Sequence, residues 1–258
     1  TTNISLARAA TFRGYAILMM ASDFCTGSLS SSPELTTAQL LDSASVWLTK
    51  GYDVGKANGT ADGIALSNAA LVGRARAKLQ KGDNAGAAAD AALVPAGFEY
   101  NMRYTDDANS RTRLSNRLYQ FSFDRGAISV APWYRQTDPR VPFRAPGSTT
   151  ANPQDQVPGG FFQQAKFTGY ASSIRLASKL EADYIAAEAS GSATTQLALI
   201  SARRTANNQA AYAGATDAAS VKTERLWLAS ACTSSTRRPG IVLRVSNKVQ
   251  PVPAIAST

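Results

Sequence analysis

Small apolar residues at helical spacing dominate residues 66–94 and predict two helices folded back on each other. The apolar positions of the first helix are Leu66, Ala69, Ala70, Gly73 and Ala77. Their intervals of three and four residues place them on one helical face. Gly82 favours the left-handed residue that ends the first helix, and Asp83 can cap the second. Because small side chains bury little area each, such a hairpin must stack on neighbours, as repeat units do.

Residues 172–206 repeat this arrangement. Gly191 interrupts the apolar pattern, and Ser192 can cap the helix that follows. The apolar stripe consists of Leu176, Leu180, Tyr184 and Ala187 before the break, and of Leu197, Ile200 and Arg204 after it. Two helical hairpins in one chain predict a helical scaffold.

Two further helices are expected ahead of the first hairpin. One is capped by Asn3 or Ser5, runs to about Ser22 and is apolar almost all round, which is typical of a central helix. The other covers residues 38–54. Residues 55–63, between this helix and the hairpin, are rich in glycine and polar side chains but lack the ligand pattern of a calcium loop. They predict a flexible connection.

A middle region with a different texture separates the two hairpins. Here helical periodicity weakens, and aromatic, arginine, proline and glycine residues mix with short β-like runs at residues 127–134 and 161–167. The sequence therefore predicts a mainly α fold of stacked helical hairpins, with an irregular loop-rich region that carries short strands.

We expect this fold to form one domain over residues 1–258. The helical scaffold would occupy residues 1–94 and 172–232, and the loop-rich, ligand-binding region residues 95–171. Because the chain opens inside a strong helical pattern with nothing before it to pack against, we also expect a further segment upstream of Thr1. Its longest apolar run is too short to span a bilayer.

The absence of histidine removes the usual triads, histidine metal sites and the commonest general base near neutral pH. Carboxylates remain, and Glu181, Asp183 and Glu188 are the candidates for a pair of catalytic acids. They lie on a helix whose other residues have structural roles, so we interpret them as solvated or ion-paired surface acids. The sequence indicates no catalytic residue, no cofactor and no metal site.

The formal net charge is +9, which is compatible with nucleic acid, acidic glycans or an anionic membrane surface. No basic run with interleaved aromatic residues and no nucleic-acid-binding signature accompanies it, so we expect no nucleic acid partner. The two cysteines, Cys25 and Cys232, do not have metal-ligand spacing. They form either two buried thiols or, as an exported protein would favour, a disulfide, which we expect.

The loop-rich region displays the candidate binding residues. Aromatic rings can stack on the apolar face of a pyranose while polar side chains bind its hydroxyl groups. The candidate stacking residues are Trp133, Tyr134, Phe161 and Phe162, and the candidate hydrogen-bonding residues are Arg135, Gln136 and Gln163. The alternative is that such aromatic side chains fill the space between the loops and the helices.

Several segments, taken in order, resemble the SusD/RagB family of outer-membrane nutrient-binding proteins. Residues 7–25 resemble the long helix of that family and its acidic-aromatic-small turn, and residues 69–100 resemble its TPR-like hairpin and the loop that follows. The middle region contributes the short motifs DPRVPF and QQAKF. Residues 174–189, followed by LISARR at residues 199–204, match the later helix pair.

The resemblance implies a TPR-like scaffold and a binding role without catalysis. It also implies a lipid-anchored position on the extracellular face of the outer membrane, through an anchor that these residues do not contain. The implied partners are an oligosaccharide or peptide ligand and a SusC-like TonB-dependent transporter. The competing hypotheses are a structural protein whose hairpins hold other polypeptides in a surface assembly, a peptide-binding RagB-like receptor and, least favoured, an enzyme.

Overall fold

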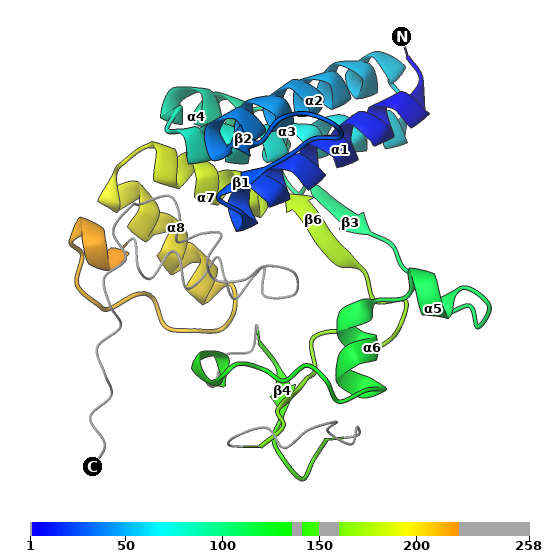
Figure 1. The fold of residues 1–258 in the computed structure, drawn as a ribbon. Coiled ribbons are helices and arrows are strands. Elements are labelled where there is room, and N and C mark those ends of the chain that lie inside the picture. The colour runs from blue at the N-terminus through cyan, green and yellow to red at the C-terminus, as the bar shows by residue number, and fades with distance from the viewer. Residues whose placement is uncertain (1, 136–140, 150–159, 222–258) are drawn as a thin grey trace.

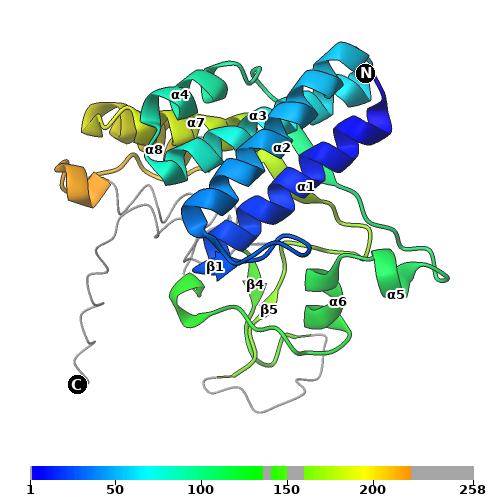
Figure 2. The ribbon, with the colours of Figure 1, turned by 45° about the horizontal axis from the view of Figure 1, so that its top comes forward.

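Antiparallel helices form one layer of the protein, as a computed structural model that describes residues 2–135, 141–149 and 160–221 shows (Figure 1). Short connections join α2 to α3, α3 to α4 and α7 to α8, and α1, α2 and α3 lie side by side (Figure 2). The helices of the scaffold are α1 (Ile4–Asp23), α2 (Thr37–Asn58), α3 (Ala61–Lys81), α4 (Asn84–Ala92), α7 (Lys179–Ala189) and α8 (Ala193–Thr205). The predicted mainly α fold of stacked hairpins is confirmed.

The helix ends follow the signals in the sequence. The side chain of Asn3 accepts hydrogen bonds from the first amides of α1, at 2.8 Å from Ser5. Thr36 and Gln39 form a capping box at the start of α2. Gly82 ends α3 with a φ of 87°, and Asp83 caps α4, so the predicted turn of the first hairpin is confirmed.

The expectation of a flexible connection over residues 55–63 is wrong. Helix α2 continues to Asn58 and α3 begins at Ala61, so only Gly59, with a φ of 71°, and Thr60 separate the two helices. Glycine is needed here for close packing: a Cβ on Gly55 would lie 2.6 Å from the carbonyl oxygen of Gly63. These glycines allow two helices to approach each other. In the sequence alone, glycines with this role cannot be told apart from the glycines of a flexible loop.

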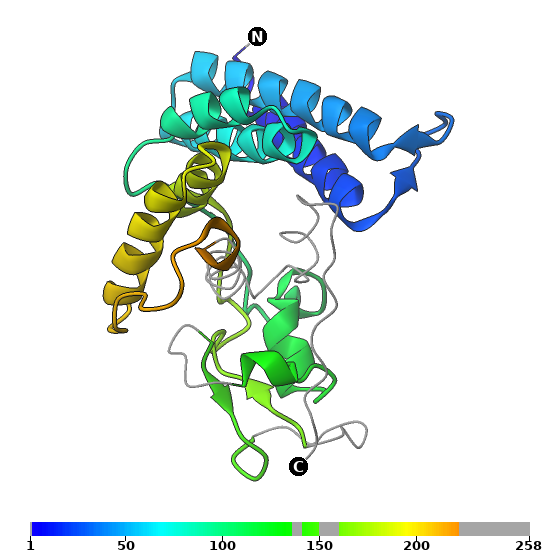
Figure 3. The ribbon, with the colours of Figure 1, turned by 90° about the vertical axis from the view of Figure 1, so that its left-hand side faces the viewer.

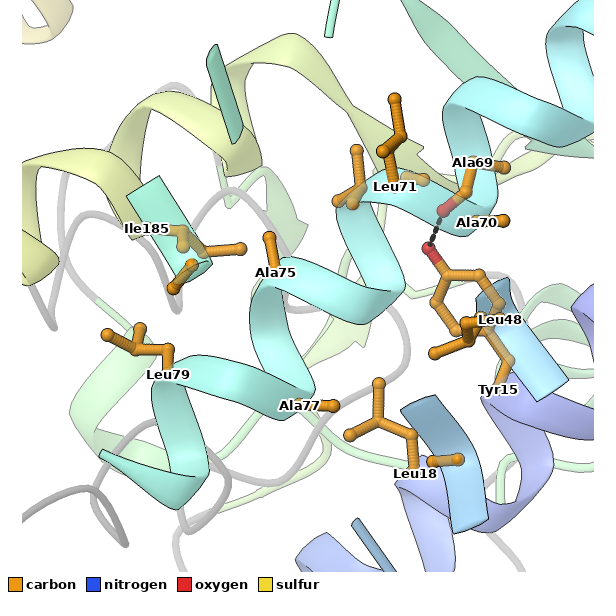
Figure 4. Close-up of a cluster of buried hydrophobic side chains, with 14 of the residues drawn as sticks. Tyr15, Leu18, Leu48, Ala69, Ala70, Leu71, Ala75, Ala77, Leu79 and Ile185 are labelled. Carbon is orange, nitrogen blue, oxygen red and sulfur yellow. Dashed lines mark hydrogen bonds between the residues drawn. The ribbon is translucent and has the colours of Figure 1, made fainter. Parts of the chain in front are cut away.

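Buried side chains from α1, α2, α3 and α7 make up the main core (Figure 4). Leu18 of α1 and Leu48 of α2 are fully buried against the small residues of α3. The hydroxyl group of Tyr15 donates a hydrogen bond to the carbonyl oxygen of Ala69 at 2.8 Å, which ties α1 to α3 inside this core. The small-residue face of the predicted hairpin is therefore the surface on which the neighbouring helices stack.

Buried ion pairs join α3 to the helices on its other side. Arg74 donates two hydrogen bonds to the carboxylate of Asp90 on α4, at 2.7 and 2.6 Å, and Lys78 lies 2.9 Å from the same carboxylate. Arg76 of α3 pairs with Glu181 of α7, with its Nε 2.6 Å from the carboxylate oxygen. Each pair fixes one later helix against α3.

The second hairpin begins differently from the prediction. Residues Ile174–Ser178 form strand β6 and not the first turn of a helix, so Leu176 belongs to a strand. The side chain of Ser178 accepts a hydrogen bond from the amide of Glu181 and starts α7 at Lys179. The break at Gly191 and the cap at Ser192 are confirmed.

Strand β6 pairs with a strand that the sequence did not reveal. Strand β3 (Glu99–Met102) runs antiparallel to β6, with a bulge between Tyr100 and Asn101. Arg175 and Glu99 pair across the ribbon at 2.6 Å. The chain leaves the helical scaffold through β3 and returns to it through β6, so both connections to the intervening segment run through this ribbon (Figure 1).

Residues 103–173 are called the loop module below, and the described part of this module, residues 103–135, 141–149 and 160–173, lies on one side of the helical layer (Figure 3). The predicted β-like run 127–134 is wrong, because it contains no strand and ends in a 3₁₀ helix; the run 161–167 is confirmed in part, since it contains β5. The module's elements are α5 (Arg111–Leu114), α6 (Arg117–Phe123), η1 (Pro132–Tyr134), β4 (Phe143–Arg144) and β5 (Gln163–Gln164). A small hairpin of β1 (Thr26–Gly27) and β2 (Leu35–Thr36) links α1 to α2.

The predicted disulfide between Cys25 and Cys232 is not tested by the structure. Cys25 is exposed at the end of α1, and Cys232 lies outside the described residues. Within the described ranges, no helix combines the length and the apolar character that crossing a membrane requires.

Candidate functional site

The short β4–β5 ribbon organises the predicted binding residues. Phe143 pairs with Gln164 and Arg144 with Gln163 in antiparallel register. Gln163 is completely buried, and its Nε2 donates a hydrogen bond to the carbonyl oxygen of Ser122 at 3.2 Å. Phe161 is also buried, with 4% of its surface exposed. In this arrangement both side chains attach the ribbon to the interior of the loop module.

Phe162 and Arg135 come together on one face of the ribbon. The guanidinium carbon of Arg135 lies 3.9 Å from the ring centroid of Phe162, and the ring of Phe143 meets Phe162 edge to face at 5.7 Å. Two hydrogen bonds hold these segments in place: the backbone amide of Val130 donates to the carbonyl of Phe162 at 2.8 Å, and the side-chain Nε of Arg135 donates to the carbonyl of Val130 at 2.8 Å. Two predicted segments about thirty residues apart therefore form one half-buried surface.

The structure describes Tyr134 in full, Trp133 only by its backbone, and Gln136 not at all. Tyr134 is half-buried in the 3₁₀ helix beside Arg135. Trp133 belongs to the same helix, and Gln136 lies outside the described residues. The surface around Phe162, Arg135 and Tyr134 is the part of the predicted site that the structure describes.

A second group of aromatic side chains was missed by the sequence analysis. Tyr119 and Phe123 stack one turn apart on α6, with centroids 4.3 Å apart and planes at 21°. Tyr170 meets Tyr119 edge to face at 4.9 Å. We call Phe123, Tyr119 and Tyr170 the aromatic row. The spacing of Tyr119 and Phe123 on a helix was the one available signal.

Buried Asn116 fixes the orientation of α6 and hence of the row. Its side-chain oxygen caps the helix by accepting from the amide of Tyr119 at 3.0 Å. Its Nδ2 donates to the carbonyl of Ser172 at 2.8 Å, and its backbone amide donates to the carbonyl of Tyr170 at 2.7 Å. One side chain therefore positions both segments that supply the row.

Charged groups flank the aromatic row at both ends. The guanidinium of Arg111 lies 4.4 Å from the ring centroid of Tyr170, and that of Arg144 lies 5.5 Å from the centroid of Phe123. The hydroxyl group of Tyr170 lies 2.6 and 2.7 Å from the two carboxylate oxygens of Asp124. This hydrogen bond, with a smaller contribution from burial, raises the pKa of Tyr170 to about 12.

The three acids considered as catalytic candidates lie on α7. Two of them take part in ion pairs: Glu181 with Arg76, and Asp183 with Lys179 at 2.9 Å. Over the described ranges, no three cysteine or acidic side chains come together in a way that could hold a metal ion. Stacking faces and hydrogen-bond donors are what the loop module presents.

Comparison with known proteins finds similarity in fold. No protein-family model and no curated protein matches the sequence. A SusD-like carbohydrate binding protein from Bacteroides vulgatus superposes with a TM-score of 0.61 at 15% identity, over 89% of this chain and 61% of that one. A SusD superfamily protein from the same organism gives a TM-score of 0.52 at 12% identity, over 93% of this chain and 64% of that one.

The chain thus spans a little over three fifths of the length of each of these two structures. The two superpositions cover about nine tenths of this chain. The similarity in its sequence segments pointed to the same family. This chain has the SusD-like fold.

Proposed function

We propose that the protein is a non-catalytic carbohydrate-binding protein whose loop module holds the ligand. The observation that carries the proposal is the meeting of Phe162 and Arg135 on one half-buried surface, next to Tyr134. These residues come from two segments that the sequence had singled out for sugar binding. Phe161 and Gln163 support the surface from inside the module and are not assigned direct contact.

The chemistry of this surface suits a sugar. An aromatic ring accepts the apolar face of a pyranose, and the guanidinium of Arg135, which lies over the ring of Phe162, has N–H groups that can donate hydrogen bonds to hydroxyl groups. Hydrogen bonds from the Val130 amide and from Nε of Arg135 already hold the loop that carries these residues, so little ordering entropy is lost when a ligand binds. The fold of a SusD-like carbohydrate binding protein supports the same conclusion.

The family resemblance extends the proposal to a location and a partner. The protein would act at the extracellular face of the outer membrane, held by a lipid anchor, and would deliver its ligand to a TonB-dependent transporter. Copurification of such a transporter with the tagged full-length protein from the native membrane tests this part. Recovery of the protein without it under mild detergent conditions would contradict the partnership.

Isothermal titration calorimetry against a panel of neutral and acidic oligosaccharides tests the binding site. We expect at least one ligand to bind and its affinity to fall about tenfold or more in a Tyr134→Ala, Phe162→Ala double variant, because a stacked aromatic contact typically contributes about 1 kcal/mol or more. Phe24→Ala is the matched control, since Phe24 is 61% exposed at the C-terminal end of α1 and does not belong to the loop module. Peptide binding with no sugar binding would favour the RagB-like alternative and contradict the proposal.

A further inference from the structure

The positive charge of the described chain is concentrated in the loop module. Residues 1–102 contain eight basic and eight acidic side chains, and residues 171–221 contain four of each. Residues 103–170 contain nine basic and five acidic ones. Up to residue 221 the scaffold is therefore neutral, and the surplus of four positive charges lies in the loop module, where we place the ligand; residues 222–258 carry the other five of the net +9. A local surplus of positive charge favours an anionic ligand.

Two of these basic side chains lie over rings of the aromatic row. Arg111 covers Tyr170 at one end, and Arg144 covers Phe123 at the other. A guanidinium held over a ring keeps N–H groups that match the two oxygens of a carboxylate. The row therefore has a guanidinium group at each of its two ends.

Neighbouring acids do not fully neutralise Arg111 and Arg144, so both arginines keep N–H groups that a ligand can use. Arg144 has no carboxylate partner among the described residues, and Arg111 binds Asp106 through Nη2 alone, at 2.8 Å. Asp124, which follows Phe123 in the chain, accepts a hydrogen bond from the hydroxyl group of Tyr170, whose oxygen lies 2.6 and 2.7 Å from the two carboxylate oxygens. The charges of the two arginines are thus only partly compensated within the protein.

We propose that the oligosaccharide bound by this protein carries uronic acid residues, whose carboxylates Arg111 and Arg144 bind at the two ends of the aromatic row. The proposal rests on the proposed carbohydrate-binding function and adds the chemical class of the ligand and a second contact surface. This surface lies apart from the Phe162 group, because successive residues of β4 point to opposite faces: Phe143 contacts Phe162, whereas Arg144 contacts Phe123.

Calorimetry with tetragalacturonate and with its fully methyl-esterified form separates charge from shape, because the two molecules differ only at the carboxylates. We expect the acid to bind and the ester to bind about tenfold more weakly or not at all. Affinity for the acid falls as sodium chloride rises from about 50 to about 300 mM, since exposed charges are screened.

Arginine variants locate the effect. We expect Arg111→Gln and Arg144→Gln each to weaken tetragalacturonate binding about two- to fivefold, and the pair to weaken it about tenfold, as for partly exposed ion pairs. Arg8→Gln is the matched control and leaves affinity unchanged, because Arg8 is half exposed on α1 next to Asp62. Circular dichroism and thermal unfolding confirm that each variant is folded.

The outcomes separate the two proposals. Equal binding of acid and ester, or of neutral sugars alone, overturns the acidic ligand and leaves carbohydrate binding in place. Absence of binding across the whole panel overturns both. If inorganic polyphosphate or anionic phospholipid vesicles bind with the same dependence on Arg111 and Arg144 and displace tetragalacturonate, the row is a general polyanion site and the uronic acid assignment is wrong.

Discussion

Tyr15 on α1 donates a hydrogen bond to the carbonyl oxygen of Ala69 on α3, 2.8 Å away in the centre of the helical layer. Burial raises the pKa of Tyr15, so the hydroxyl group stays protonated and remains a donor at physiological pH. The guanidinium of Arg76 lies 5.6 Å from the same ring. Helices α1 and α3 pack closely because the residues between them are small, and this hydrogen bond adds a polar contact between them.

Replacing Tyr15 with phenylalanine should lower the free energy of unfolding by about 1 kcal/mol, because a buried hydrogen bond is lost while the ring remains. Chemical denaturation measures the change. Tyr212→Phe is the control, since Tyr212 donates a similar 3.0 Å bond to the carbonyl of Ala215 in an exposed position. A Tyr15 variant as stable as the Tyr212 variant would contradict the assigned role.

Gly73 should not tolerate a methyl group. A Cβ there would lie 2.9 Å from Cζ of Tyr15 and 3.0 Å from Cδ2 of Leu48. Overpacking typically costs about 1 to 3 kcal/mol, whereas alanine gains about 1 kcal/mol in helix propensity. We therefore expect Gly73→Ala to lower the free energy of unfolding, by about 1 kcal/mol net. Val46→Ala, at a position 67% exposed, should change it by less than about 0.5 kcal/mol.

The ion pair between Arg76 and Glu181 should contribute more to stability than an exposed pair. The two side chains are 8% and 19% exposed, and removing one partner leaves a charge in a poorly hydrated place. Arg76→Met should cost about 3 kcal/mol of unfolding free energy. Arg175→Met breaks the exposed pair with Glu99 and should cost less than about 1 kcal/mol. Similar losses in the two variants would argue against a structural role for the buried pair.

The hydrogen bond to Asp124 should be visible in the titration of Tyr170. It raises the pKa of Tyr170 from 10.0 to about 12, so the folded state holds this proton more tightly than the unfolded state. The resulting stability is fully present below about pH 10 and is lost as pH rises towards 12. NMR of isotope-labelled tyrosine, assigned with Tyr170→Phe, measures the pKa.

Asp124→Asn should return that pKa towards its ordinary value, because the charged acceptor is removed. Asp107→Asn is the control and should leave the pKa of Tyr170 unchanged, since Asp107 does not contribute to the shift. An ordinary pKa for Tyr170 in the unmodified protein would show that its hydroxyl group does not bind Asp124 in solution.

The parts of the fold that were predicted correctly depend on contacts close in sequence. Caps at Asn3 and Ser192 and the turns at Gly82 and Gly191 each lie within a few residues of the groups they satisfy. The β3–β6 ribbon is different, because its strands are about seventy residues apart and each is too short for a clear alternation. Only the pairing itself makes residues 174–178 a strand.

The candidate site shows the same division. Arg135 and Phe162 were both singled out by their residue types, but their contact depends on backbone bonds between separate loops. The burial of Gln163 could not be predicted, because its amide partner is the carbonyl of Ser122 on another element. The aromatic row combines α6 with Tyr170, and its flanking arginines come from α5 and β4, so no local pattern describes the group.

The β3–β6 ribbon allows the helical scaffold to fold independently of the segment inserted between the two strands. Its cross-strand bonds hold the departing and returning chain side by side, as Glu99 opposite Ser178 and Met102 opposite Ile174 show. The entropy of closing the intervening loop grows only slowly with its length, by about 0.6 kcal/mol for each doubling. A shorter or longer insert could therefore be grafted between Met102 and Ile174 without refolding the helices, and new ligand specificities could be installed on an unchanged frame.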